Sequence, residues 1–242
     1  MTKVDNLNVK IYADGANLEE IIRLAQNPLI QGFTTNPTLM RRAGVSDYET
    51  FARDVLAEIT DRPVSFEVFA DDKDGMIAQA RTIATWGDNV NVKIPFTNTK
   101  GESMLPAIEE LSNSGVQVNV TAMMTVDHVA QTVKVPNPDV PAIVSVFAGR
   151  IADTGMDPVP VMQEARSLLA DCPKAELLWA SPRELLNIFH ADEAGCHIIT
   201  VTNDLLAKLV NVGKDLDQFS LETVLMFYRD ACEAGYSIRT QS

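Results

Sequence analysis

The sequence predicts a single-domain (β/α)8 barrel of the α/β class. Short apolar runs of strand type alternate with amphipathic helical stretches along the whole chain. There are eight such units of roughly 25 residues each, which is the number that closes a barrel. No G-x-G-x-x-G motif follows a strand, which disfavours the alternative fold, an open doubly wound sheet.

Each expected strand is rich in β-branched and other apolar residues and is bounded by glycine, proline or polar residues. In chain order the strands are expected at 8–14, 32–36, 64–69, 90–95, 116–122, 142–149, 175–181 and 196–202. Helical patterns lie between them, for example at 18–26, 48–59, 75–86 and 158–170, and a last helix is expected at 221–235. Residue types that cap helices mark four of the starts, namely Asn17, Ser46 or Asp47, Asp157 and Ser220.

No linker or shift in composition divides the chain, so we expect one domain over residues 1–242 with its core from about 8 to about 236. The last helix carries an apolar face that can pack on the barrel or join a second copy in a homo-oligomer. We favour packing on the barrel.

Composition narrows the possible partners. The chain has 33 acidic and 20 basic residues and a formal net charge of −13, which disfavours nucleic acid and anionic membranes. The three cysteines, Cys172, Cys196 and Cys232, lack the spacing of a disulfide framework or a metal site. No signal-peptide pattern or membrane-length apolar run occurs, so we expect a cytoplasmic protein.

Alternation within the strands predicts which side chains face the barrel lumen. In the fourth strand Val90, Val92 and Ile94 face the helices, which leaves Lys93 inside, and the same alternation puts Glu67 inside on the preceding strand. The carboxyl ends of the strands hold the active sites of barrel enzymes. Near these ends the other strands and the turns after them present Tyr12, Asp14, Thr34, Asn36, Asn119, Thr121, Ser145, Phe147, Arg150, Ser181 and Arg183.

A plainer interpretation of these charges stays open. On pattern alone, a lysine or glutamate in an alternating strand is more often a solvated residue. Every strand here has a helix on each side, however, and a charge buried in a barrel must be paired or functional. The alternation therefore leaves the two interpretations of Lys93 about equally supported.

The inward residues favour lysine chemistry. An amine among apolar walls is penalised in its charged form, and the neutral amine can attack a carbonyl to form a Schiff base. The iminium then accepts electrons during cleavage or formation of a C–C bond. Asp14 or Glu67 can shuttle protons, and Arg150 and Arg183 can bind a phosphate. No metal-ligand cluster or cofactor motif occurs, so we expect a cofactor-free aldol site for a sugar phosphate.

Five segments resemble the transaldolase family. GFTTNPTLM (32–40) is similar to the family signature, and VNVKIPFTNTKG (90–101) is similar to its Schiff-base lysine segment. Further family blocks resemble, in the same order, NVTAMM (119–124), SVFAGRI (145–151) and ASPR (180–183). The resemblance extends from about residue 8 to about residue 236, and the chain length is similar to the short branch, which includes fructose-6-phosphate aldolases.

The resemblance implies a role for each matched residue. Lys93 is expected to form the Schiff base with the ketose carbonyl, and Asp14 to act as the acid and base in breaking the C3–C4 bond. Glu67 and Thr121 are expected to hold the water that serves the carbinolamine steps. The expected substrate-binding residues are Asn36, Asn119, Ser145 and Ser181 for hydroxyls, Arg150 and Arg183 for the phosphate, and Phe147.

The implied reaction belongs to the pentose phosphate pathway. It transfers a dihydroxyacetone unit from fructose 6-phosphate or sedoheptulose 7-phosphate to erythrose 4-phosphate or glyceraldehyde 3-phosphate. Fructose-6-phosphate aldolases carry tyrosine where this chain has Phe147, which favours transfer over release of the unit. Gly15 departs from the family by replacing a hydroxyl residue beside Asp14. The alternatives are a fructose-6-phosphate or related sugar aldolase and a non-catalytic barrel that binds a sugar phosphate.

Overall fold

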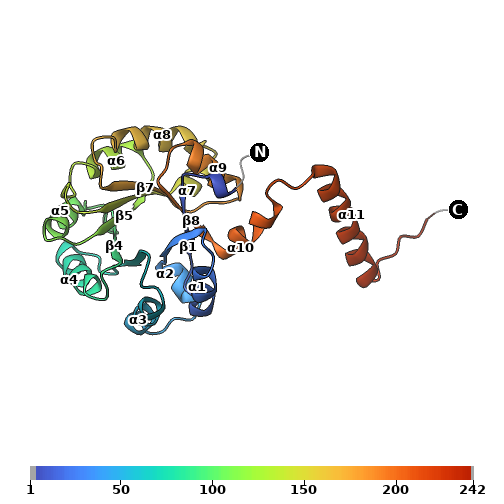
Figure 1. Cartoon of the computed structure of the whole chain (residues 1–242), viewed down its shortest axis with the longest axis horizontal. Coiled ribbons are helices and arrows are strands. Elements are labelled where there is room, and N and C mark those ends of the chain that lie inside the picture. Colours follow the sequence, from blue (N-terminus) through green and yellow to red (C-terminus); the bar gives the residue numbers. More distant parts are fainter. Residues whose placement is uncertain (1–3, 241–242) are drawn as a thin grey trace.

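The computed structural model describes residues 4–240 and confirms the predicted barrel. Within these residues, eight parallel strands pair in chain order, and the last pairs with the first to close the sheet (Figure 1). The strands are β1 (Lys10–Asp14), β2 (Ile30–Thr34), β3 (Val64–Glu67), β4 (Val90–Pro95), β5 (Val118–Met123), β6 (Ala142–Val146), β7 (Ala175–Trp179) and β8 (Ile198–Thr202).

Helices surround the barrel. They are α1 (Leu18–Ala25), α2 (Pro37–Arg42), α3 (Tyr48–Glu58), α4 (Lys73–Ala84), α5 (Leu105–Asn113), α6 (Val126–Thr132), α7 (Ala148–Ala152), α8 (Pro158–Leu168), α9 (Leu186–Glu193) and α10 (Asn203–Leu206). A 3-10 turn, η1 (Val4–Asn6), precedes β1, and another, η2 (Ala207–Asn211), follows α10. The chain ends in α11 (Leu216–Glu233).

Helix caps confirm most of the predicted starts. The side chains of Asn17, Asp47 and Asp157 accept hydrogen bonds from first-turn amides of α1, α3 and α8. The expected start at Ser220 is wrong, because α11 begins at Leu216 behind the cap Asp215. Asp215 accepts from the Gln218 amide, and this places Ser220 inside the helix.

Strand β2 ends earlier than the sequence pattern suggests. The expected strand ran to residue 36, but Asn36 instead caps α2 and Pro37 occupies its first turn. Proline has a fixed φ that suits this first turn and lacks the N–H that the turn would leave unsatisfied. Asn36 thereby lies at the mouth of the barrel rather than within the sheet.

A layer of buried side chains closes the lumen on the side of the amino ends of the strands. Tyr12, Ile143, Leu178 and Ile198 pack together there with exposed fractions of 4% or less. Gly32 is required for this layer, because a Cβ at that position would lie 2.6 Å from the Tyr12 ring. The polar lumen above the layer is therefore separated from a smaller cavity at the amino ends of the strands, lined in part by Lys10 and Glu176.

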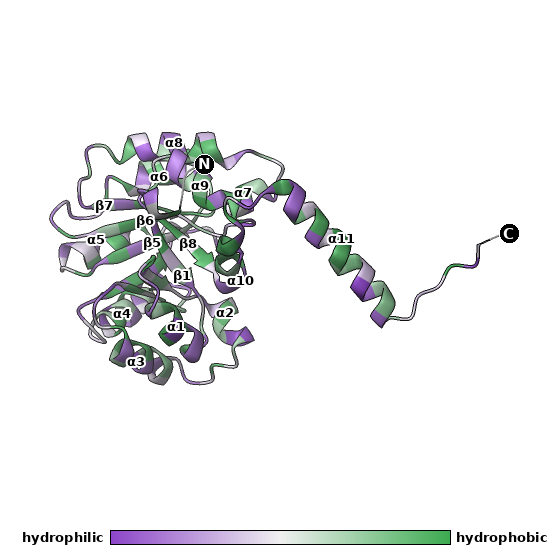
Figure 2. Ribbon diagram, turned by 45° about the vertical axis from the view of Figure 1, so that its right-hand side comes forward, coloured by the Kyte–Doolittle hydropathy of each residue, from purple (hydrophilic) through white to green (hydrophobic). Residues whose placement is uncertain are grey.

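Helix α11 lies away from the barrel, so the prediction that it packs on the barrel is wrong (Figures 1 and 2). None of its residues is buried, and Val224, Leu225 and Phe227 are more than half exposed. Figure 2 shows apolar and polar residues alternating along it. The sequence pattern identified an amphipathic helix correctly, but such a pattern does not say which surface covers the apolar face.

Among residues 4–240, no helix combines the length and the apolar character needed to cross a membrane.

Candidate active site

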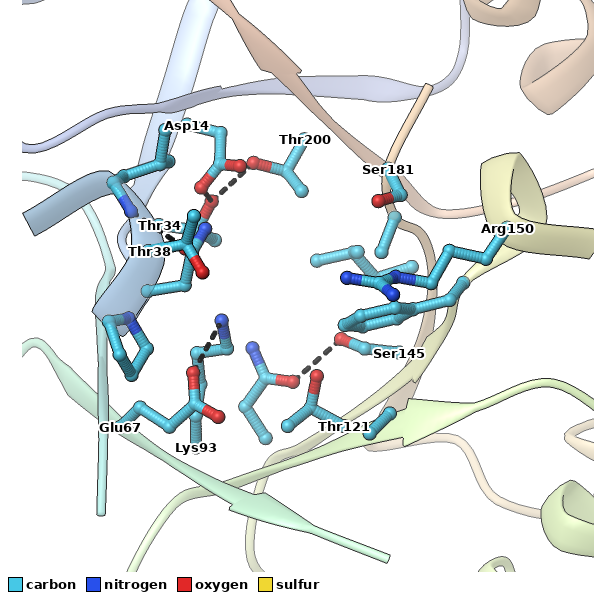
Figure 3. A pocket seen from close by; sticks show the side chains of 18 of the residues that line it. Asp14, Thr34, Thr38, Glu67, Lys93, Thr121, Ser145, Arg150, Ser181 and Thr200 are labelled. Atoms are coloured by element: carbon cyan, nitrogen blue, oxygen red, sulfur yellow. Dashed lines mark hydrogen bonds and ion pairs between the residues drawn. The ribbon is translucent and has the colours of Figure 1, made fainter. Parts of the chain in front are cut away.

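A cavity of about 430 Å³ opens at the carboxyl ends of the strands (Figure 3). It is lined by all eleven residues to which the sequence assigned a catalytic or binding role. They come from seven strands and from the segments that directly follow those strands. The eleven are Asp14, Asn36, Glu67, Lys93, Asn119, Thr121, Ser145, Phe147, Arg150, Ser181 and Arg183. Thr34 also lines this cavity, whereas Tyr12 lies in the buried layer beneath it.

Lys93 is the buried cation of this cavity. Its exposed fraction is 7%, and its Nζ lies 3.3 Å from Oε2 of Glu67. The two residues are register partners on β4 and β3, which brings their side chains together on the lumen side. Lys93 Nζ also donates a 2.9 Å hydrogen bond to the Thr35 carbonyl. The amine therefore has a fixed position, with one wall formed by a carboxylate that can exchange a proton with it.

On the side facing β2, the backbone of Glu67 is held by a side chain rather than by a neighbouring strand. Strands β2 and β3 pair only at Val64 and Ser65, so β3 has lost this neighbour where Glu67 begins. The Tyr48 hydroxyl of α3 accepts a 2.7 Å hydrogen bond from the Glu67 amide and donates a 3.0 Å bond to its carbonyl. Burial raises the pKa of Tyr48, which keeps this hydroxyl protonated and able to donate.

Asp14 ends β1 on another side of the cavity from Glu67 (Figure 3). Its Oδ1 accepts a 2.8 Å hydrogen bond from the Thr34 hydroxyl. Burial raises the pKa of the Asp14 carboxyl, and this effect exceeds the lowering caused by the Lys93 ammonium and the Thr34 hydrogen bond. A carboxyl with a raised pKa takes up a proton more readily than an ordinary aspartate, which suits a group that must accept and return one.

A second hydrogen-bonded group lines the wall formed by β5 and β6. Asn119 is fully buried, and its Oδ1 accepts a 2.6 Å bond from Ser145. Its Nδ2 donates to Ser65 at 3.2 Å. Nearby, the buried Thr121 hydroxyl has no hydrogen-bond partner within residues 4–240. An unpaired buried hydroxyl is costly, and a water or substrate hydroxyl in the cavity would satisfy it.

Two arginines lie at the mouth of the cavity, and they differ in whether they form an ion pair. Arg183 directs Nε and Nη2 at both carboxylate oxygens of Asp153, with the Nε–Oδ1 distance at 2.9 Å. The pairing lowers the pKa of Asp153. Arg150 forms no ion pair with a carboxylate in residues 4–240, and its guanidinium lies 5.5 Å from the centre of the Phe147 ring. Arg150 is therefore the better placed of the two for an incoming anion.

Two tight backbone features position this mouth. Ser181 has φ +63° although it is not glycine, a conformation that costs energy and persists only where the surroundings enforce it. A Cβ on Gly149 would lie 1.5 Å from the Ser181 carbonyl oxygen, so only glycine lets α7 approach the end of β7. This contact places Arg150, the next residue, beside Ser181 at the cavity.

Several residues that line the cavity or support its walls were not identified by the sequence analysis. Thr38 and Arg42 reach the cavity from α2, and strand alternation says nothing about a helix. Ser65 and Thr200 are buried on β3 and β8 and could have been found by extending the same alternation. The placement of Tyr48 beneath Glu67 had no signal in the sequence.

Comparison with known proteins identifies a family. The model of the family "Transaldolase/Fructose-6-phosphate aldolase" matches residues 11–238. The chain belongs to this family. A probable transaldolase of Streptococcus equi subsp. zooepidemicus is 36% identical over 202 residues, covering 83% of this chain and 90% of the relative. A probable transaldolase 2 of Listeria monocytogenes is 35% identical over 202 residues, covering 83% and 88%.

A solved structure shows the same fold. A mandelate oxidase variant aligns with a TM-score of 0.55 over 92% of this chain and 74% of its own. At 15% identity, this likeness supports the barrel fold alone.

Proposed function

We propose that this chain is a transaldolase that moves a dihydroxyacetone unit between sugar phosphates through a Schiff base on Lys93. The observation that carries the proposal is the buried Lys93–Glu67 pair, which shares one cavity with Asp14 and with Arg150. The donors are fructose 6-phosphate or sedoheptulose 7-phosphate, and the acceptors are erythrose 4-phosphate or glyceraldehyde 3-phosphate. This reaction belongs to the pentose phosphate pathway.

The first step forms the covalent adduct. Neutral Lys93 Nζ attacks the ketose carbonyl carbon, and the carbonyl oxygen takes a proton to give a carbinolamine. Loss of that oxygen as water leaves the iminium. Glu67 can accept and return the protons of these steps, with a water held between it and the unpaired Thr121 hydroxyl.

The second step breaks the C–C bond. Asp14 takes the proton of the C4 hydroxyl, the C3–C4 bonding pair moves into the iminium, and an enamine and an aldehyde result. Asn119, held by Ser145 and Ser65, faces the retained three-carbon unit. Asn36 uses Oδ1 to cap α2, so its Nδ2 is left to donate to a substrate hydroxyl. The reverse sequence with the acceptor aldehyde completes the transfer.

The phosphate binds at the far side of the cavity. Arg150 and Ser181 lie together there, across the cavity from Asp14 and Thr34 (Figure 3). The guanidinium of Arg150 offers a planar set of donors for phosphate oxygens. Arg183 already pairs with Asp153, so it contributes chiefly by holding the end of β7 and adding positive charge.

Transfer, rather than release, is favoured by Phe147. Its ring lies under the Arg150 guanidinium and packs on the buried layer below, so it places no hydroxyl near the adduct. A site with fewer polar groups there holds less water to protonate the enamine and free the dihydroxyacetone unit.

Borohydride trapping tests the proposal. The protein is treated with borohydride in the presence of fructose 6-phosphate, and its mass is measured by intact-protein mass spectrometry. Wild type should gain the mass of the reduced dihydroxyacetone unit or of the whole reduced sugar. Lys93→Met should show no gain. Absence of any adduct in wild type would instead leave a barrel that binds a sugar phosphate without catalysis.

Product analysis separates transfer from aldol cleavage. With erythrose 4-phosphate present, a transaldolase makes sedoheptulose 7-phosphate and little free dihydroxyacetone. Release of dihydroxyacetone that no acceptor redirects would identify a fructose-6-phosphate or related sugar aldolase.

We also propose that the chain forms a single domain, requires no cofactor and assembles as a homo-oligomer through α11. This helix exposes Val224, Leu225, Phe227 and Tyr228, which is more apolar surface than a free helix keeps in water. Light scattering after gel filtration should give a mass above one chain, and Leu225→Glu should lower it. The cytoplasmic location stays a prediction.

A further inference from the structure

Two threonine hydroxyls from opposite sides of β1 meet beside Asp14. Thr34 extends from β2 and Thr200 from β8, and β1 pairs with both strands. Both side chains are buried, with exposed fractions of 4% and 5%. Their Oγ1 atoms are in hydrogen-bond contact, and Oγ1 of Thr34 also lies 2.8 Å from Oδ1 of Asp14 (Figure 3).

The number of available protons fixes the direction of the two hydrogen bonds that link Thr200, Thr34 and Asp14. A threonine hydroxyl has one proton, and an ionised carboxylate has none to give. Thr34 must therefore donate its proton to ionised Asp14, and it has none left for Thr200. Thr200 must then be the donor in the contact between the two hydroxyls. The hydrogen bonds run from Thr200 to Thr34 and from Thr34 to Asp14 Oδ1.

We propose that Thr200 is a positioning residue which, through Thr34, reserves Oδ1 of Asp14 as an acceptor and leaves Oδ2 to take the substrate proton. The inference rests on the proposed function, because it assigns a partner to the proposed acid and base. When the C4 hydroxyl proton moves to Oδ2, Oδ1 becomes the carbonyl oxygen of a neutral acid and still accepts from Thr34. The carboxyl group need not rotate between the two halves of the reaction.

The surroundings of Asp14 show why these hydroxyls matter. Lys93 from β4 and the Thr34 hydroxyl from β2 favour the ionised form, while burial and Glu67 from β3 oppose it. Thr200 from β8 supports the ionised form only through Thr34, because donation to Thr34 polarises the bond that Thr34 makes. Loss of either hydroxyl should therefore raise the pKa of Asp14 further.

Isosteric variants test the inference. Thr34→Val should lower kcat for transfer about tenfold to a hundredfold, the range for loss of a hydrogen bond to a charged group, and Thr200→Val should lower it by less. Both should move the acidic limb of the pH profile of kcat to higher pH. The kcat of the double variant should be only slightly lower than that of Thr34→Val alone, because both changes break the same series of linked hydrogen bonds. Thr200→Ser should restore the wild-type profile.

Controls separate positioning from folding. Thr132→Val removes another fully buried hydroxyl, which donates to the His128 carbonyl on α6, and should leave the pH profile unchanged. Borohydride-trapped adduct on Lys93 should stay within about twofold of wild type in Thr200→Val, because Thr200 acts at the cleavage step. A loss of adduct equal to the loss of kcat would mean general distortion and would overturn the inference. An unmoved acidic limb, or a serine variant no better than the valine variant, would overturn it too.

One measurement needs no substrate. NMR of the Asp14 carboxyl in the full-length protein should show a higher pKa in Thr200→Val than in wild type. If wild type forms no Lys93 adduct, the proposed function fails, yet this titration still decides whether Thr200 acts on Asp14. An unchanged titration would refute the role of Thr200 even in an active transaldolase.

Discussion

The two ends of the barrel each carry a lysine–glutamate pair, and the pairs differ in what surrounds them. Lys10 and Glu176 at the amino end approach to 2.7 Å, with 42% and 32% of their side chains exposed. Lys93 and Glu67 at the carboxyl end are 3.3 Å apart, with 9% and 19% exposed. The closer contact is the more solvated one, so distance alone does not identify a reactive pair. Burial beside an open cavity distinguishes the second pair.

The largest expected effect comes from replacing the glutamate of the carboxyl-end pair, compared with replacing the glutamate of the amino-end pair. Glu67→Gln keeps the size of the side chain but cannot exchange protons with the adduct, so kcat for transfer should fall about a hundredfold or more. Glu176→Gln is the matched control and should change kcat less than about twofold, because Glu176 lies below the buried layer. Steady-state kinetics measures both, and equal losses would remove the functional distinction between the two ends.

The arginines at the carboxyl end sharpen the comparison, because one is paired and the other is not. Arg150→Ala should raise KM for fructose 6-phosphate about tenfold to a hundredfold, through loss of charge-assisted hydrogen bonds. KM for free dihydroxyacetone should change much less. Arg183→Ala should have a smaller effect, since its guanidinium already pairs with Asp153. Equal effects on phosphorylated and free substrates would exclude phosphate binding by Arg150.

The third prediction concerns stability. The pKa of Asp14 is raised in the folded state, so its carboxyl favours folding at low pH, and this contribution is lost as the pH rises through the folded pKa. At neutral pH the buried carboxylate therefore costs stability. Asp14→Asn should increase the free energy of unfolding there, on the order of 1 kcal/mol.

Denaturant unfolding of both proteins at neutral pH and near pH 4 checks the sign. The advantage of Asp14→Asn should shrink as the pH falls, because at about pH 4 and below Asp14 becomes protonated in both states of wild type. A variant that is less stable than wild type at both pH values would show that the carboxyl contributes stability instead.

The smallest effect is expected at the amino end. Lys10→Met removes a partly exposed ion pair and should lower the free energy of unfolding by no more than about 1 kcal/mol, with kcat unchanged within about twofold. High salt should reduce even this difference, because exposed charges are screened. A large loss of activity in Lys10→Met would mean that the buried layer does not isolate the two ends.

Alternation along the strands predicted this difference between the ends only in part. It placed Lys93 and Glu67 inside from their own strands, because each side chain's direction is set by its immediate neighbours. It could not show that Thr34 meets Thr200, since that contact depends on closure of the barrel between residues 166 positions apart. Nor could the sequence pattern show that α11 lies away from the barrel, because amphipathicity does not specify which surface a helix packs against.

The layer of Tyr12, Ile143, Leu178 and Ile198 also dictates an order of events. The cavity above it opens at the carboxyl ends of the strands, so substrates and products share the mouth that Arg150 and Ser181 border. In a transfer reaction the first aldehyde must depart before the second can arrive, and between the two the protein holds a three-carbon fragment beneath an open entrance. Two-substrate kinetics should therefore be ping-pong. The yield of transfer then depends on whether the acceptor sugar reaches the three-carbon fragment before a water molecule does.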